Sequence, residues 1–406
     1  MSASKPQQRD EVRIKHSLNK NEKAFVARRR NTVLQCLQKF NIHCSQDKVP
    51  NIALLGSGGG QRAMVGLLGS LVQLDKAGLL DCILYLSGVS GSTWCMASLY
   101  KEPDWSTKLE TVKDKIIKRL SGEGVNWKDA FAKLRKYYYG KDFFSLTDVW
   151  AAMFVTSFVK EIDEGTLTDE WKKHSKDPFP IYTVIDKHCK QSEEGDPWFE
   201  INPYEAGYSL TGAFVDASNF GSQFHKGSKK THQNVLDMLY LQAVCSSALA
   251  DGEEIWKWIK GPNSQSIEEY YQVLMDLVDM NLAVLEGTST TDISALDQSI
   301  KTTLNDISGG EGQPLCKAFC LGASADLKAD KQYMTQYTID VCNQFVKLKL
   351  DFWPFDQIDS WRKNHRTSNL PYSPERVAEL VDVAGKNISN NKEKLLEQIR
   401  AAAEAK

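Results

Sequence analysis

The chain has 406 residues, which predicts one large domain or two ordinary ones. Its hydrophobic fraction of 42% and charged fraction of 25% are typical of a globular protein, and a net charge of −2 gives no global attraction to nucleic acid. No apolar run reaches the roughly 18 residues that a bilayer requires, so the sequence predicts at most a transient, peripheral contact with membranes.

The cysteines are nine in number, scattered, and without a CxxC pair. This pattern predicts reduced thiols in a cytosolic protein and favours neither a disulfide framework nor a zinc site. The first residues lack the apolar stretch of a signal peptide, and neither end carries a lipidation motif. The expected location is the cytoplasm, with peripheral association to intracellular membranes.

Residues 1–48 form a polar, basic segment. Arg28, Arg29 and Arg30 are followed by apolar residues at helical spacing, which predicts a surface helix that leads into the main domain. Two interpretations of the three arginines remain open. They form a solvated helix face, or they attract anionic lipid head groups.

The pattern changes at residue 51. A short apolar run at 52–55 predicts a buried strand, glycines at 56–60 a loop, and apolar spacing over 62–78 a helix. A second strand is expected at 82–86. This order predicts an α/β fold with a central mixed, largely parallel sheet and a strand-turn-helix nucleophile elbow.

Helical patterns dominate the middle of the chain and predict a helical cap or lid insertion. The expected helices cover 108–119, 127–139 and 268–285, a flexible connection is expected at 308–314, and the tail from 374 to 406 is expected to be helical.

Two further segments each allow two interpretations. The apolar run 150–159 is a buried core helix or the wall of an acyl-chain cleft. The mixture of cations and aromatic residues at 133–139 is a solvated helix end or a membrane contact.

The motif Gly88-Val89-Ser90-Gly91-Ser92 carries the first indication of chemistry. A serine between glycines at the end of an apolar strand is typical of a nucleophile elbow, where small neighbours permit a strained turn. The alternative is an ordinary strand-to-helix turn in which Ser90 or Ser92 caps the helix.

The glycine loop at 56–60 also has an alternative, because such a loop can cradle a phosphate in a nucleotide-binding protein. It lacks the Gly-Lys-Ser/Thr ending of a P-loop, and its glycine spacing differs from that of a dinucleotide fold. Two loops at the carboxyl ends of two strands instead predict a nucleophile beside backbone N–H donors for an oxyanion.

The segments Gly56–Met64 and Leu86–Trp94 together resemble the cytosolic, group IV phospholipase A2 family. Further similar segments are Asn202–Gly207, Gly212–Phe214, Phe220–Phe224, Pro371–Pro374 and Ala384–Asn387. With only about 50 residues before the glycine loop, the chain looks like the gamma-like short members that lack a C2 domain.

The resemblance implies a role for each matching residue. Ser90 matches the nucleophile that attacks the sn-2 ester carbonyl, Gly59 and Gly60 match the oxyanion donors, and Arg62 matches the arginine that holds the substrate phosphate. The implied substrate is a glycerophospholipid at a membrane surface. Lysophospholipase or acyl-transfer activity is implied as well, with no metal and no cofactor.

The family uses a serine-aspartate dyad without histidine, and the dyad aspartate is not found. In relatives it lies in an apolar strand before Phe-Ser and follows an Asp-Ala-Gly motif, and neither element is present here. Asp351 is a weak substitute. None of the seven histidines lies in a motif, so each is expected at the surface.

The domain at 49–406 therefore resembles the family's catalytic domain with an internal segment missing near 353–358. Such a deletion would expose a sheet edge. The leading hypothesis is a phospholipase A2-type serine hydrolase. The alternative is a catalytically impaired lipid-binding paralogue or isoform that lacks the dyad aspartate.

Overall fold

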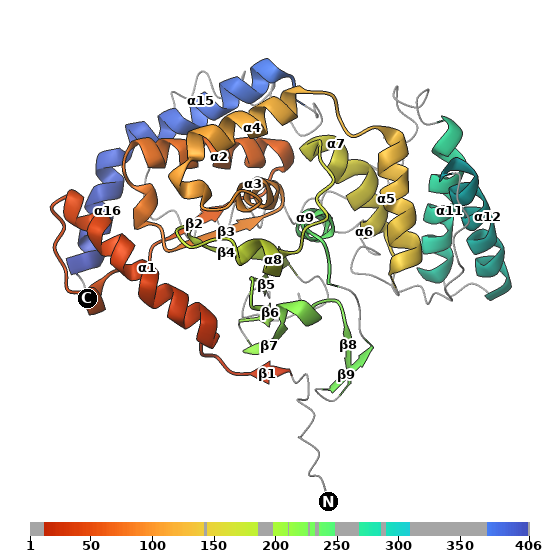
Figure 1. Ribbon diagram of the computed structural model, residues 1–406, viewed down its shortest axis with the longest axis horizontal. Coiled ribbons are helices and arrows are strands. Elements are labelled where there is room, and N and C mark those ends of the chain that lie inside the picture. Colours follow the sequence, from red (N-terminus) through yellow and green to blue (C-terminus); the bar gives the residue numbers. More distant parts are fainter. Residues whose placement is uncertain are drawn as a thin grey trace, which may run out of the picture.

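The computed structural model (Figure 1) describes residues 12–141, 144–185, 198–209, 211–225, 228–231, 235–247, 268–285, 290–308 and 372–404. A seven-stranded sheet with the order β1-β7-β6-β5-β4-β3-β2 forms its centre, and a two-stranded sheet, β8-β9, lies apart from it. The strands are β1 (Arg13–Ile14), β2 (Ala53–Gly56), β3 (Tyr85–Val89), β4 (Phe179–Ile185), β5 (Trp198–Ile201), β6 (Glu205–Tyr208), β7 (Ala213–Asp216), β8 (Gln223–His225) and β9 (Ser228–Thr231).

Helices surround the β2–β4 end of the sheet and extend to one side of it (Figure 1). The longer ones are α1 (Lys20–Lys39), α2 (Gly60–Lys76), α3 (Gly91–Tyr100), α4 (Leu109–Ser121), α5 (Trp127–Gly140), α9 (Met238–Ser246), α11 (Glu268–Leu285), α12 (Thr290–Ser308), α15 (Pro374–Asn390) and α16 (Lys392–Glu404). The shorter ones are η1 (Gln46–Lys48), η2 (Leu80–Cys82), η3 (Trp105–Thr107), α6 (Leu146–Val149), the π-helix η4 (Trp150–Val155), α7 (Thr156–Val159), α8 (Leu167–Trp171) and η5 (Ala217–Asn219).

The mixed α/β sheet and its strand-turn-helix elbow are as predicted, but the parallel share is smaller than expected. Within the seven strands described, β2–β3 and β3–β4 are parallel and the other four pairings are antiparallel. The reason is connection length. Helical crossovers join β2 to β3 and β3 to β4, whereas the links from β5 to β6 and from β6 to β7 are too short for a parallel return.

The N-terminal helix packs into the core, and two of its three arginines bind groups of the main domain. Arg29 is 4% exposed, and its guanidinium donates to the carbonyl oxygens of Ile83, at 2.8 Å, and Lys176. Arg30 donates to Asn51. The triplet is therefore not a uniform solvated face, because its central residue donates to the buried carbonyl group of Ile83. Arg28 is exposed, and its attraction to lipid head groups stays a prediction.

The segment 133–139 was expected at a solvated helix end or a membrane interface, and the structure shows a buried ionic network instead. Lys133 is 4% exposed and contacts Asp237 at 2.7 Å and Glu164 at 2.6 Å. The Tyr137 hydroxyl donates to Asp237 at 2.6 Å, and Asp237 also caps α9. The network joins α5 to α9. Only part of this segment, such as Lys136, is exposed.

The apolar run 150–159 is buried for most of its length, in agreement with the first of its two interpretations, a core segment. All six residues of η4 are buried, and Trp150 stacks on Phe154 at a centroid distance of 5.1 Å. The acyl-chain cleft stays a prediction.

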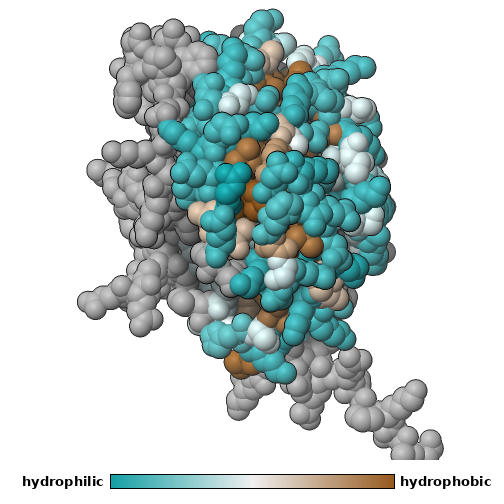
Figure 2. Space-filling view, turned by 90° about the vertical axis from the view of Figure 1, so that its left-hand side faces the viewer, coloured by the Kyte–Doolittle hydropathy of each residue, from teal (hydrophilic) through white to brown (hydrophobic). Residues whose placement is uncertain are grey.

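The C-terminal helix α15 lies along α2, as the side-by-side ribbons in Figure 1 show. A Cβ atom added to Gly69 of α2 would lie 2.4 Å from the carbonyl oxygen of Val381, so the absence of a side chain permits this close approach. Figure 2 shows the face near α1 and α16, where hydrophobic atoms form only small areas among hydrophilic ones.

Within the described part of the chain, no helix is long and apolar enough to cross a bilayer. The predicted connection at 308–314 lies almost wholly outside the described residues.

Candidate active site

Ser90 lies at the turn between β3 and α3 in a backbone conformation that is rare for a residue with a side chain. Its φ is 55° and its ψ is −130°. Such a conformation costs roughly 1–3 kcal/mol and persists only where its surroundings enforce it. Here the Ser90 N–H donates to the carbonyl oxygen of Cys245, and the Ser90 carbonyl accepts from Thr93 N–H, each at 2.9 Å.

The serine side chain does not act as an ordinary helix cap. Ser90 occupies the N-cap position of α3 without a side-chain capping bond, and the Ser92 hydroxyl donates to the carbonyl oxygen of Ser57 at 2.6 Å. Ser92 therefore links the serine turn to the glycine loop. The strained backbone of Ser90 favours the elbow over the capping alternative.

The two loops meet because β2 and β3 are parallel neighbours in register. Gly56 lies opposite Gly88, so the chain leaves both strands at the same edge of the sheet. A Cβ atom added to Gly91 would lie 1.8 Å from the carbonyl oxygen of Gly60. The structure thus brings the predicted nucleophile and the predicted oxyanion loop into direct contact.

The glycine loop begins α2. Gly59 is the N-cap with a φ of 138°, and Gly60 is the first helical residue with a φ of 57°. No side chain caps this helix, and the N–H groups of a first helical turn have no partner within their own helix. Together with the helix dipole, they offer a favourable site for an oxygen that gains negative charge.

Arg62 lies on the first turn of α2, and its guanidinium folds back toward the glycine loop. A Cβ atom added to Gly59 would lie 3.5 Å from Nη2 of Arg62. Burial raises the pKa of the Tyr372 phenol, and the charges of Arg62 and Arg376 oppose that rise. The cation is therefore near both the loop and the start of the C-terminal block.

Sequence reasoning assigned no role to Gln61, Phe158 and Tyr372, which meet beside this loop. Gln61 is fully buried and bonds to the backbone of Phe158 and Tyr372. Phe158 in turn stacks on Trp94 of α3 at a centroid distance of 5.6 Å. Gln61 stands inside the quoted motif, but its two partners are 97 and 311 residues away and no local pattern reveals them.

The base for Ser90 is not identified. Asp351, the predicted weak substitute, lies outside the described residues. Among those that are described, no side chain is hydrogen-bonded to Ser90 Oγ. In the same part of the chain, no cluster of three or more His, Cys, Asp or Glu residues is arranged to hold a metal ion.

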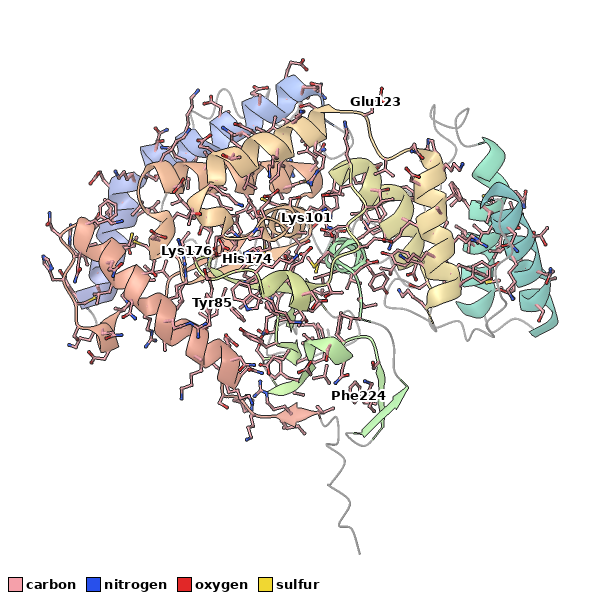
Figure 3. The ribbon with its side chains drawn as sticks, in the orientation of Figure 1. Tyr85, Lys101, Glu123, His174, Lys176 and Phe224 are labelled. Carbon is pink, nitrogen blue, oxygen red and sulfur yellow. The ribbon has the colours of Figure 1, made fainter. Side chains whose placement is uncertain are left out.

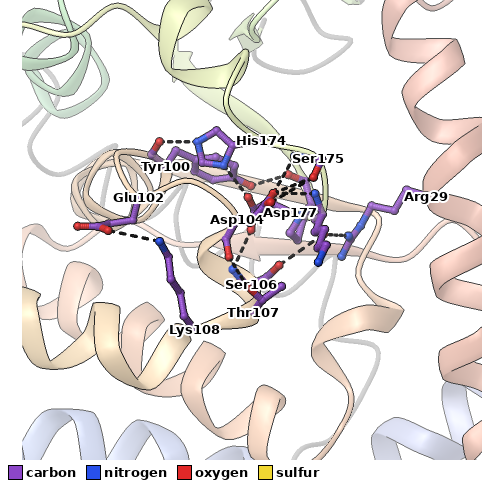
Figure 4. Close-up of polar contacts among 12 residues, drawn as sticks. Arg29, Tyr100, Glu102, Asp104, Ser106, Thr107, Lys108, His174, Ser175 and Asp177 are labelled. Atoms are coloured by element: carbon purple, nitrogen blue, oxygen red, sulfur yellow. Dashed lines mark hydrogen bonds and ion pairs between the residues drawn. The ribbon is translucent and has the colours of Figure 1, made fainter.

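The expectation that every histidine lies at the surface is wrong for His174. Its buried side chain is hydrogen-bonded to Asp177 at 2.5 Å, and its Nε2 donates to the carbonyl oxygen of Tyr100 at 2.7 Å (Figures 3 and 4). Tyr100 ends α3 and Ser90 precedes it, so about 15 Å of helix separates His174 from the serine. His174 joins α3 to the turn before β4 and is no base for Ser90.

The comparisons with known proteins agree with this arrangement. Residues 52–251 match the family model described as a lysophospholipase catalytic domain. Cytosolic phospholipase A2 gamma of Mus musculus is 33% identical over 315 residues, covering 71% of this chain and 51% of the relative. The Homo sapiens protein of the same name is 37% identical over 257 residues, covering 61% and 46%. The chain belongs to the cytosolic phospholipase A2 family.

A solved structure of the family has the same fold. Human GIVD cytosolic phospholipase A2, in complex with methyl gamma-linolenyl fluorophosphonate, has a TM-score of 0.65 at 19% identity, covering 98% of this chain and 66% of that one. Our chain spans about half the length of the curated gamma relatives. Its place in the cytosolic phospholipase A2 family thus rests on the catalytic-domain match, the serine turn and the glycine loop.

Proposed function

We propose that this protein is a phospholipase A2-type serine hydrolase that cleaves the sn-2 acyl ester of glycerophospholipids. The observation that carries the proposal is the strained Ser90 packed against the glycine loop at the shared edge of β2 and β3. A nucleophile and uncapped helical N–H groups side by side are what acyl transfer requires.

The reaction assigns one task to each residue of the site. Ser90 Oγ attacks the ester carbonyl carbon, its proton passes to a base that is still to be identified, and the N–H groups of Gly59 and Gly60 hold the oxyanion. Collapse of the tetrahedral intermediate expels the lysophospholipid alkoxide, which takes up a proton. Water then hydrolyses the acyl-serine, and another alcohol in its place gives acyl transfer.

Arg62 binds the phosphate of the substrate. A planar guanidinium that is always charged forms paired hydrogen bonds with phosphate oxygens, and its position over Gly59 brings the head group close to the oxyanion loop. No step of this scheme uses a metal or a cofactor. A lysophospholipid keeps the same ester and phosphate groups, so lysophospholipase activity uses the same residues.

The remaining parts of the proposal concern organisation and location. We assign residues 49–406 to the catalytic domain and 1–48 to a basic N-terminal segment, although β1 and α1 pack directly on that domain. The protein would act in the cytoplasm and contact intracellular membranes peripherally. The names of the relatives support the cytosolic location.

A second function is supported by one specific observation. The sequence contains neither an Asp-Ala-Gly motif nor an apolar strand followed by Phe-Ser, the two elements that mark the dyad aspartate in relatives. A serine without a base loses several orders of magnitude in rate, and such a protein would bind phospholipids without cleaving them.

A fluorophosphonate probe separates the two functions. We expect the folded protein to be labelled at Ser90, the Ser90→Ala variant to be unlabelled, and the Ser70→Ala variant to be labelled like the wild type. Ser70 is a suitable control because its hydroxyl bonds within α2, to the Gly66 carbonyl. A folded wild type that binds phospholipid vesicles but takes no label would instead establish the lipid-binding function.

A further inference from the structure

The side chain of Gln61 is a buried link between three separate parts of the chain. It is 0% exposed. Its Nε2 donates to the carbonyl oxygen of Phe158 at 3.0 Å, and its Oε1 accepts from the N–H of Tyr372 at 2.7 Å. The amide therefore uses both its donor and its acceptor on backbone groups. The bond to Tyr372 is buried, and the bond to Phe158 is partly buried.

The two partners determine which way the amide points. A backbone carbonyl only accepts and a backbone N–H only donates. Rotation of the Gln61 amide by 180° would therefore place its oxygen against the Phe158 carbonyl and its NH₂ group against the Tyr372 N–H. A buried polar group without a partner costs about 1–3 kcal/mol. The side chain thus has one satisfied orientation, and this orientation fixes the start of α2 relative to both partners.

The two partners belong to different elements beside the site. Phe158 lies in α7 and stacks on Trp94, four residues after Ser90 in the sequence. Tyr372 directly precedes Ser373, the N-cap of α15. Through Gln61, the first turn of α2 is attached to α7, which packs on α3, and to the residues that begin α15.

The residues on either side of Gln61 in the sequence have proposed roles in the reaction, as an oxyanion donor and as the ligand of the substrate phosphate. Gly60 precedes it and Arg62 follows it. The close contact of the Gly60 carbonyl with Gly91 leaves little room for the loop to shift without disturbing the serine turn. A residue that holds the first turn of α2 therefore sets the distance between the oxyanion donors and Ser90.

We propose that Gln61 is a positioning residue. It fixes the position of the Gly59–Gly60 donors and of Arg62 relative to Ser90, and it links this position to the start of α15. The proposal rests on the function proposed above. Gln61 does not touch the reacting atoms. It acts through the backbone of its two neighbours.

Gln61→Met tests the proposal, because methionine has a similar length and neither hydrogen bond. We measure the inactivation constant and the apparent affinity for the same fluorophosphonate probe, with thermal unfolding alongside. The expected result is a fall in the inactivation constant of at least about 10-fold, with little change in affinity, because a misplaced oxyanion loop slows the chemical step. The control is Gln73→Met, which alters α2 where it meets Gly385 of α15.

Gln61→Glu gives a second readout that does not depend on how well the methionine variant folds. A neutral carboxylic acid keeps one acceptor and one donor, whereas a carboxylate faces the Phe158 carbonyl without a donor. The labelling rate of this variant, divided by that of the wild type at the same pH, should rise as pH falls. Burial favours the neutral acid. Arg62, the next residue in the chain, and Arg376, which lies near the partner residue Tyr372, favour the carboxylate.

The outcomes are distinct. If the wild type is labelled, two results overturn the role of Gln61 alone. One is that Gln61→Met is labelled as fast as the wild type. The other is that the labelling rate of Gln61→Glu relative to the wild type does not change with pH. A Gln73→Met variant as slow as Gln61→Met also overturns it, because general loosening of α2 would then explain the loss. A folded wild type that takes no label overturns the proposed function and this inference with it.

Discussion

At the scale of single residues, the candidate site depends on glycines, which allow two loops to approach closely. Gly91 approaches the Gly60 carbonyl so closely that a methyl group at Gly91 cannot fit without movement of one of the two loops. Ser90 tolerates its positive φ because its N–H and carbonyl groups are both bonded to neighbouring residues. The serine turn is thus held by packing and by backbone hydrogen bonds.

Gly91→Ala is predicted to damage both stability and reactivity. We expect a loss of about 1–3 kcal/mol in the free energy of unfolding, from overpacking, and a collapse of fluorophosphonate labelling. Urea denaturation and probe kinetics measure the two effects. Gly66→Ala in α2 is the control. Nothing lies within 4 Å of its added methyl group, and alanine should stabilise the helix by up to about 1 kcal/mol. Equal stability of the two variants would contradict the packing argument.

At the scale of secondary-structure elements, α2 is the central unit of the site. Its first turn carries the glycine loop and Arg62, and its middle packs on α15. Two glycines, Gly69 and Gly385, lie at this helix pair, but they are not equivalent. At Gly69 the backbone of Val381 fills the place of a side chain, whereas Gly385 has ordinary spacing.

Gly69→Ala is predicted to separate α2 from α15. The added methyl group would lie 2.4 Å from a backbone oxygen, so we expect a loss of about 1–3 kcal/mol in the free energy of unfolding. Gly385→Ala should be neutral or slightly stabilising, because the nearest atom to its methyl group is at 3.5 Å. Urea denaturation of both variants checks the difference. A loss at Gly385 as large as that at Gly69 would show that the helix pair is not packed as described.

At the scale of the whole molecule, one hydrophobic core joins α1, the sheet, the middle helices and the C-terminal helices. Ionisable side chains are also buried in the molecule. Glu170 is 7% exposed, and burial, assisted by the charge of Asp163, raises the pKa of its carboxyl group to about 8. The carboxyl group is therefore mainly neutral in the folded protein at pH 7.

This raised pKa makes global stability depend on pH. The folded state holds a proton that the unfolded state, with a pKa near 4.5, has already released. The contribution of Glu170 is thus fully present below pH 4.5 and is lost as pH rises toward 8, by at most about 1.4 kcal/mol per pH unit.

Glu170→Gln should remove this dependence, because its amide stays neutral. Urea denaturation between pH 5 and 8 should show the variant gaining stability relative to the wild type as pH rises. Glu397→Gln, at an exposed position of α16, is the matched control and should follow the wild type. A constant difference between Glu170→Gln and the wild type across this range would contradict the raised pKa.

The sequence by itself determined the parts of this protein that depend on short segments. The strand, glycine loop and helix at 52–78 and the serine turn at 88–92 were predictable, because hydrophobic spacing and glycine placement act over a few residues. Family membership followed from the same segments. The boundaries of β2 and α2 differ from the predicted ones by one or two residues.

Only the tertiary structure decided how these segments meet. The antiparallel half of the sheet, the burial of Arg29 and Lys133, the distance of His174 from Ser90, and the two bonds of Gln61 all depend on contacts between residues far apart in the sequence. Charged and amide side chains are normally predicted to be solvent-exposed. Their buried partner is often a backbone group, and a backbone group cannot be identified from residue types. The serine and its loop were therefore readable from the sequence, and the residues that hold them in place were not.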